Sequence, residues 1–161
     1  MHPFSRMLLT LRSTILLALV VAGSFAACGG RQATSPTPAA TPAIRTLFVR
    51  LGGLPAITAI VDELFANLAA DDRVSSFFVA SDPARLKQHF VDQLCAAAGG
   101  PCVYRGRTMA VAHAGLHITN SHFYAVVEDL VKALDTLRIP ELERSDLLGI
   151  IATLEADVVG R

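Results

Sequence analysis

Residues 54–70 read LPAITAIVDELFANLAA, and this stretch decides the fold class because its apolar side chains recur with the period of an α-helix. Pro55 suits the first turn of such a helix, and Asp71 with Asp72 marks its end. The spacing therefore predicts an amphipathic helix over 54–70, and its buried stripe comprises Ile57, Ile60, Val61, Leu64, Phe65 and Leu68.

The same period returns further along the chain. Asp82 followed by Pro83 predicts the start of a second helix, and the Gly-Gly-Pro run at 99–101 predicts its end. No segment alternates apolar and polar residues in the manner of a half-buried strand, so we predict an all-α fold. The remaining helical patterns cover 109–116, 120–134 and 140–158.

The first 45 residues differ in composition from the rest. Arg6 and Arg12 flank a short apolar stretch, and small residues precede Cys28, as in a secretory signal. The sequence FAAC at 25–28 resembles the bacterial lipobox, whose Cys becomes the lipidated first residue; an ordinary signal cleaved nearby and an uncleaved anchor are the alternatives. We therefore expect a signal peptide over 1–27, lipidated Cys28 with a Pro/Thr/Ala-rich linker over 28–45, and one domain over 46–161. Such a lipoprotein is exported, and its acyl chains hold it to a membrane, facing the periplasm or the cell exterior.

The charge of the chain is balanced. Lys and Arg number 14, as do Asp and Glu, so the formal net charge is zero. A nucleic-acid-binding protein needs a basic face to neutralise phosphates, and the sequence offers none. We expect no nucleic-acid partner.

Two histidines are candidate functional residues on the evidence of their positions alone. His89 and His113 fall on the apolar faces of different predicted helices, and His89 shares its stripe with Gln93. Each could be an ordinary core histidine, or the two could be axial ligands of a haem in a cavity lined by Phe, Leu and Met. A zinc site would need further ligands that the pattern does not supply. His117 falls in a predicted loop, and His122 at a helix start, where we expect a capping or solvated role.

Cys95 and Cys102 flank the Gly-Gly-Pro break after the second predicted helix. Once Cys28 is lipidated, these two remain, an even number outside the reducing cytoplasm. A disulfide and two free thiols are both compatible with their spacing. A zinc knuckle with His89 is a weaker alternative.

From Leu47 onward the chain resembles the group I truncated haemoglobins over about 115 residues. The resemblance is carried, in order, by LFVRLGG at 47–53, DDRVSSFF at 71–78, GGPCVYRGRTM at 99–109, AHAGLHIT at 112–119 and HFYAVVEDL at 122–130. It implies a truncated globin-like, two-over-two helical sandwich that binds haem b.

The resemblance also implies roles for single residues. His113 matches the proximal iron ligand, and His89 matches a position from which some members coordinate the iron on the distal side. Where members that hold oxygen tightly often have Tyr and Gln, this chain has Phe65 and Phe90, so two hydrogen-bond donors are missing. Gln93, one turn after His89, is the candidate for a replacement polar contact. The implied haem contacts are Phe65, Phe78, Leu86, Phe90, Leu94, Met109, Val126 and Ile151.

Three functions follow as alternatives. The first is a haem globin that binds oxygen, nitric oxide or carbon monoxide. In it, His89 either makes the iron six-coordinate opposite His113, or bonds a haem propionate or lies exposed at the pocket mouth. The second is a nitric oxide dioxygenase, or an electron-transfer protein with an unknown redox partner, on the same fold. The third is a helical binding lipoprotein that has lost haem, against which the retention of His113, Met109 and Phe78 argues.

Overall fold

The computed structural model describes residues 45–161, and throughout this range the regular structure is helical. The predicted signal peptide, Cys28 and all of the linker except Arg45 lie outside the described residues. The helices are α1 (Leu47–Leu51), α2 (Leu54–Ala70), the 3₁₀ turn η1 (Ser75–Phe77), α3 (Pro83–Ala97), α4 (Met109–His113), α5 (Asn120–Thr136), α6 (Glu141–Ala152) and α7 (Glu155–Val158).

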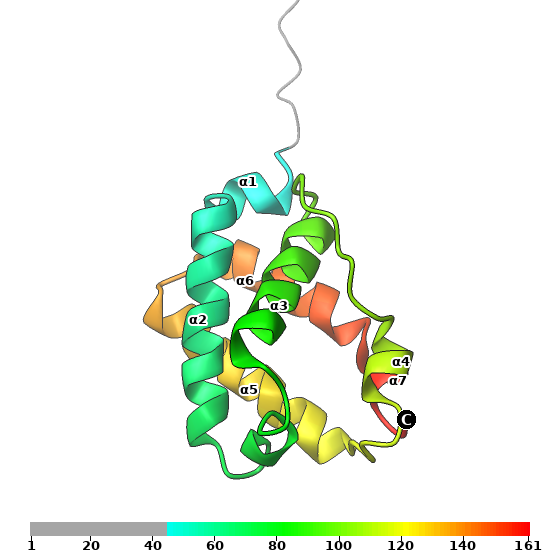
Figure 1. Ribbon diagram of the computed structural model, residues 1–161. Helices are drawn as coiled ribbons and strands as arrows, with labels where there is room; N and C mark the ends of the chain where they lie inside the picture. The colour runs from blue at the N-terminus through cyan, green and yellow to red at the C-terminus, as the bar shows by residue number, and fades with distance from the viewer. Residues whose placement is uncertain (1–44) are drawn as a thin grey trace, which may run out of the picture. The chain divides into compact units, whose positions relative to one another are not determined.

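Two helices lie across two others (Figure 1). α2 and α3 form one layer, and α5 with α6 forms the second layer behind it. α2 packs on both α3 and α5, so its apolar stripe lies at the centre of the core. This arrangement confirms the predicted two-over-two helical sandwich. The most deeply buried side chains are Ile57, Ile60, Val61 and Leu68 of α2, Leu134 of α5 and Leu147 of α6.

The start of α3 is fixed by a side-chain cap and a proline. The Asp82 carboxylate accepts hydrogen bonds from the backbone N–H groups of Ala84 and Arg85, at 3.0 and 3.3 Å, and Pro83 occupies the first position of α3. This cap satisfies donors that the first turn of a helix leaves free. α2 and α3 thus begin where the sequence predicts.

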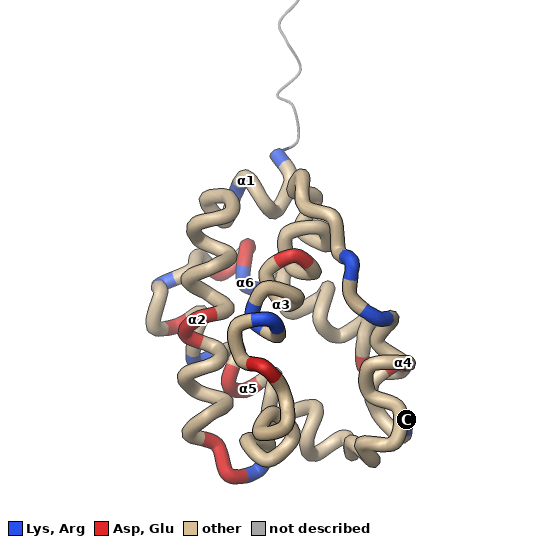
Figure 2. The backbone as a smooth tube through the Cα atoms, in the orientation of Figure 1, with Lys and Arg blue, Asp and Glu red and all other residues tan. Residues whose placement is uncertain are grey.

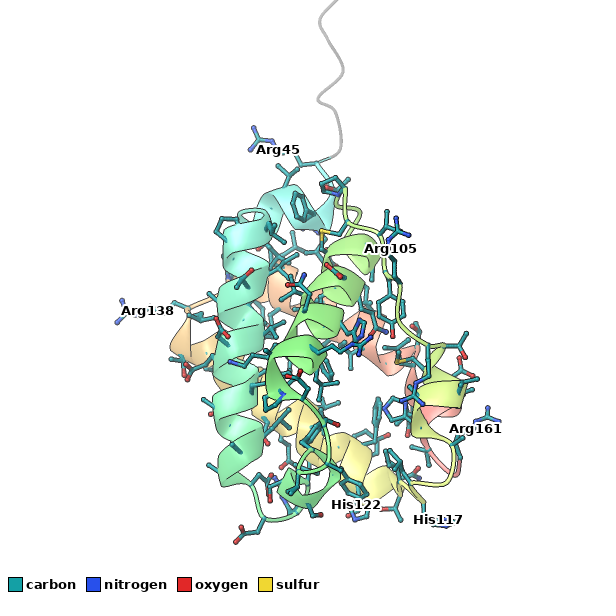
Figure 3. The ribbon with its side chains drawn as sticks, in the orientation of Figure 1. Arg45, Arg105, His117, His122, Arg138 and Arg161 are labelled. Carbon is teal, nitrogen blue, oxygen red and sulfur yellow. A yellow bond between two sulfur atoms is a disulfide. The ribbon has the colours of Figure 1, made fainter. Side chains whose placement is uncertain are left out.

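A disulfide between Cys95 and Cys102 joins the end of α3 to the loop that follows it, near α1 (Figure 3). The Phe48 N–H donates to the Ala98 carbonyl at 2.8 Å, which fastens α1 to the same corner. Gly100 is required here because a Cβ would overlap Phe48 and the Cys95 sulfur. The start of the domain and the end of α3 are therefore held together.

Charged residues are distributed over the helices and loops of residues 45–161 (Figure 2), and most of them are at least partly exposed. Asp129 is the exception, since it is only 1% exposed at the contact between α5 and α2. Its carboxylate pairs with Lys132 at 2.8 Å, and its backbone carbonyl accepts from the Asn67 amide at 3.0 Å. At the end of α2, the Arg73 guanidinium donates to Asp71 and lowers the pKa of that carboxyl to about 2.

The structure corrects two of the helical predictions, those over 109–116 and 140–158. The helix predicted over 140–158 is broken, because Thr153 and Leu154 donate to carbonyls three residues back and tighten the chain between α6 and α7. The turn predicted over 109–116 ends as α4 at His113, and Gly115, at a φ of +78°, lets the chain turn away. Within residues 45–161, no helix has the length and apolar character needed to cross a membrane.

Candidate functional site

A cavity of about 710 Å³ lies among α3, α4, α5, α6 and α7. Its wall is mostly aromatic and aliphatic, and it includes three histidines: His89 of α3, His113 of α4 and His122 of α5. Such a volume is in the range of pockets that enclose small organic molecules. The predicted site residues that line it are Phe78, Leu86, His89, Phe90, Leu94, Met109, His113, Val126 and Ile151.

His113 is held in one orientation by its own helix. Its Nδ1 lies 2.7 Å from the Met109 carbonyl oxygen, four residues earlier in the chain. Because a carbonyl can only accept, Nδ1 carries the proton and donates it. The other ring nitrogen, Nε2, therefore keeps its lone pair, as metal coordination by a neutral imidazole requires.

His89 lies on α3, half-buried in the cavity wall. Its ring meets the ring of Tyr104 nearly edge-on, with centroids 6.2 Å apart and planes at 75°. It forms no hydrogen bond with any residue in the range 45–161. Both of its nitrogens therefore remain available to a ligand in the cavity or to water.

Phe65 is the predicted contact that the structure does not place on the cavity wall. Its ring packs edge-on against Phe90, at 5.2 Å, and more loosely against Phe78, at 6.3 Å. The Lys87 ammonium lies 5.6 Å from its ring centre. Phe65 thus supports Phe78 and Phe90, two of the phenylalanines that form the wall.

Four charged residues lie along the rim of the cavity: Arg85, Arg105 and Arg107, with Asp82 as the only carboxylate. None of the three guanidinium groups has an ion pair within residues 45–161. Arg105 lies on the loop between α3 and α4 and points outward from it (Figure 3). The rim therefore favours a ligand with negative groups at its edge.

The sequence did not single out Tyr104, Arg105 or Arg107, because residues of a loop follow no period that would predict their neighbours. Sequence-based reasoning placed the other two histidines correctly. His122 caps α5, since its Nδ1 accepts from the Thr119 N–H and its own N–H donates to the Thr119 hydroxyl, both at 3.3 Å. His117 is exposed in the loop before α5 and lies away from the cavity wall (Figure 3).

Residues 46–159 match the Bacterial-like globin family. Group 1 truncated haemoglobin GlbN of Mycolicibacterium paratuberculosis is 35% identical over 113 residues, which are 70% of this chain and 83% of that protein. GlbN of Nostoc sp. is 38% identical over 116 residues, which are 72% of this chain and 98% of that protein. The chain belongs to the group 1 truncated haemoglobins.

Solved structures agree with this assignment. The truncated haemoglobin of Tetrahymena pyriformis in its Fe(III) form has a TM-score of 0.70 at 31% identity, and the match covers 73% of this chain and all of that one. The 2/2 haemoglobin of Synechococcus sp. PCC 7002, in the cyanomet state with covalently attached haem, has a TM-score of 0.68 at 32% identity. That match also covers 73% of this chain and 100% of the other.

The cavity of this truncated haemoglobin fits haem b. Haem b is a flat, apolar macrocycle with two carboxylates at one edge and an iron that needs an axial ligand. The apolar wall suits the macrocycle, and the free Nε2 of His113 suits the iron. Three arginines and one aspartate give the rim a net charge of +2, which matches the two carboxylates.

Proposed function

We propose that this truncated haemoglobin holds haem b in the cavity through His113 and binds a diatomic gas there. When bound, the haem iron supplies a coordination site that accepts oxygen, nitric oxide or carbon monoxide. The observation that carries this proposal is the hydrogen bond from His113 Nδ1 to the Met109 carbonyl, because it fixes the tautomer that can coordinate iron.

On the side of the cavity opposite His113, few side chains can donate a hydrogen bond to a ligand. Phe90 and Leu86 line that side and offer no hydrogen-bond donor to a gas ligand. His89 is the imidazole on this side, and we infer that it coordinates the iron as a second axial ligand. A gas then binds only after His89 leaves, so its apparent affinity falls with the fraction of molecules in which the pocket is open.

Electron transfer is the second candidate function, and the presence of His89 favours it. Two imidazoles that stay coordinated in both oxidation states would leave the geometry at the iron unchanged when an electron moves. The redox partner would be unknown. Nitric oxide dioxygenase activity is disfavoured, because Phe65 and Phe90 cannot donate the hydrogen bonds that Tyr and Gln at these positions would give to a bound oxygen.

We further propose that the protein is an exported lipoprotein anchored through Cys28. The lipobox-like FAAC at 25–28 and the Pro/Thr/Ala-rich stretch after it support this proposal. The disulfide between Cys95 and Cys102 is consistent with it, since disulfides persist in compartments outside the cytoplasm.

The test of haem binding is the variant His113→Gly. We expect the purified variant to lose most of its haem and its Soret absorption, because it lacks the imidazole that α4 contributes to the cavity wall. Imidazole added to the buffer should restore both, since it can occupy the vacated position. His117→Ala is the matched control and should bind haem as the wild type does. An unchanged Soret band in His113→Gly would refute the proximal assignment.

A further inference from the structure

The loop between α3 and α4 carries one aromatic side chain into the cavity wall, Tyr104. Its ring is the aromatic neighbour of His89, 6.2 Å away and inclined by 75°. This edge-on arrangement is one that aromatic rings prefer. The contact joins the loop to the part of α3 that carries the proposed second iron ligand.

Tyr104 is itself held firmly. Its hydroxyl donates to the Arg107 carbonyl at 2.7 Å. Its ring lies across Gly106, where any Cβ would overlap the phenol, so glycine is what allows the loop to close in this way. Burial raises the pKa of Tyr104, so the hydroxyl stays protonated and remains a donor.

The disulfide fixes the same loop to the same helix. Cys102 precedes Tyr104 by two residues, and Cys95 follows His89 by six on α3. The loop is therefore fastened to α3 at the disulfide and again at the pair of rings. By contrast, the His89 ring has no hydrogen bond within residues 45–161 that would restrain it.

We propose that Tyr104 is a positioning residue, whose ring confines the His89 imidazole to the cavity and thereby sets how readily gas reaches the iron. This inference rests on the proposed function, in which His89 coordinates the iron. A half-buried histidine at a cavity rim can otherwise rotate into water, where its nitrogens are solvated. Tyr104 occupies the space beside it and restricts that rotation.

The size of the effect follows from the rotamers. A free side chain distributes among three staggered χ1 wells, so confining it to one raises the population of that well by up to about threefold. Without the Tyr104 ring, the ratio of open to closed pockets should rise by the same factor. Carbon monoxide association should then accelerate in proportion.

The experiment compares Tyr104→Leu with Tyr124→Leu in the haem-loaded protein. Tyr124 lies on α5, is 51% exposed and does not line the cavity, so its variant controls for loss of an aromatic ring. We expect Tyr104→Leu to bind carbon monoxide about threefold faster and to contain less low-spin ferrous iron. Tyr104→Phe, which keeps the ring, should lie between Tyr104→Leu and the wild type, and Tyr124→Leu should match the wild type. Equal rates in Tyr104→Leu and the wild type would overturn the proposal.

A second measurement does not depend on gas-binding kinetics. In the diamagnetic low-spin ferrous protein without carbon monoxide, nuclear Overhauser effects should connect the Tyr104 ring protons with those of His89, and Tyr104→Leu should abolish them. Their absence in the wild type would also overturn the positioning role. A wild-type ferrous spectrum that is already five-coordinate would instead refute the proposed coordination by His89, so the two failures are distinguishable.

Discussion

The two proposed iron ligands, His89 and His113, differ in what restrains them. His113 is anchored by a 2.7 Å hydrogen bond within its own helix, whereas His89 is restrained by packing against Tyr104. A ligand held by a hydrogen bond keeps its orientation when the other side of the cavity changes. One held only by packing can leave and return. This difference makes His113 the permanent ligand and His89 the exchangeable one in the proposed mechanism.

We predict that His89→Leu converts the ferrous protein from a low-spin to a high-spin, five-coordinate form. Leucine fills a similar space but cannot coordinate, so the distal position stays open and carbon monoxide binds faster. Absorption spectra and flash photolysis measure the two effects. His117→Ala, at an exposed histidine away from the cavity, should change neither. The coordination is disproved if the wild-type ferrous protein is already high-spin and five-coordinate.

The missing distal donors lead to a second prediction. In the His89→Leu background, Phe90→Gln places an amide on the cavity wall, where it can donate to bound oxygen. One such hydrogen bond is worth about 1 kcal/mol, so oxygen should dissociate roughly fivefold more slowly. Stopped-flow displacement by carbon monoxide measures this rate.

Phe65→Tyr is the matched comparison for that experiment. Phe65 lies behind Phe90 and Phe78 rather than on the wall, so a hydroxyl there should have a smaller effect than the amide at position 90. A larger effect from Phe65→Tyr would mean that the Phe65 ring reaches the cavity in the haem-bound protein.

Among the helices, those with an uninterrupted apolar period were predictable. α2 begins and ends at the predicted residues, and α3 begins at Pro83, because caps and periodicity act locally along the chain. The break between α6 and α7 was not predictable, since the apolar spacing continues across Thr153 and only the backbone tightens there. Periodicity identifies the face of a helix that is buried, but not which neighbour each side chain meets.

Because periodicity identifies only the buried face of a helix, the sequence could predict some residues of the site and not others. The histidines and most apolar wall residues lie on helices, so their faces could be deduced. Tyr104 and Arg107 lie in a loop, and they reach the wall through the disulfide, Gly106 and the packing of the loop against α3. Those contacts depend on tertiary structure, so no periodic pattern in the sequence predicts them.

We predict that the disulfide between Cys95 and Cys102 is formed in the mature protein and stabilises it. The mature domain should contain no thiol that reacts with a blocking reagent until a reductant is added. Reduction should lower the free energy of unfolding by about 2 kcal/mol, since the bond closes a short loop. It should also speed haem loss, because the released loop forms part of the cavity wall.

Cys95→Ala/Cys102→Ala is the control for the reductant itself. Cys95 is fully buried, so the double variant also loses packing, but its stability and haem loss should no longer respond to the reductant. Two freely reactive thiols in the untreated protein would contradict the disulfide.

Across its 161 residues, the sequence combines a globin domain with an N-terminal segment of different composition. The family match begins at residue 46, after the Pro/Thr/Ala-rich stretch. Such a stretch has too few large apolar side chains to build a core and suits a spacer. In the proposed arrangement, a gas-binding domain is held near a membrane surface by a lipid at Cys28.

Replacing Cys28 by Ser tests that arrangement directly. The thiol of Cys28 is the proposed attachment point, and each buried methylene of an acyl chain contributes about 0.8 kcal/mol to membrane binding. The wild type, expressed in a bacterium that processes lipoproteins, should incorporate labelled palmitate and partition into the detergent phase. The Cys28→Ser protein should remain unlabelled and should either appear in the aqueous phase or accumulate as an unprocessed precursor. Cys95→Ser/Cys102→Ser, which retains Cys28, is the control and should be labelled like the wild type. Continued lipid labelling of Cys28→Ser would show that the anchor is attached elsewhere and would remove the basis for the lipoprotein proposal.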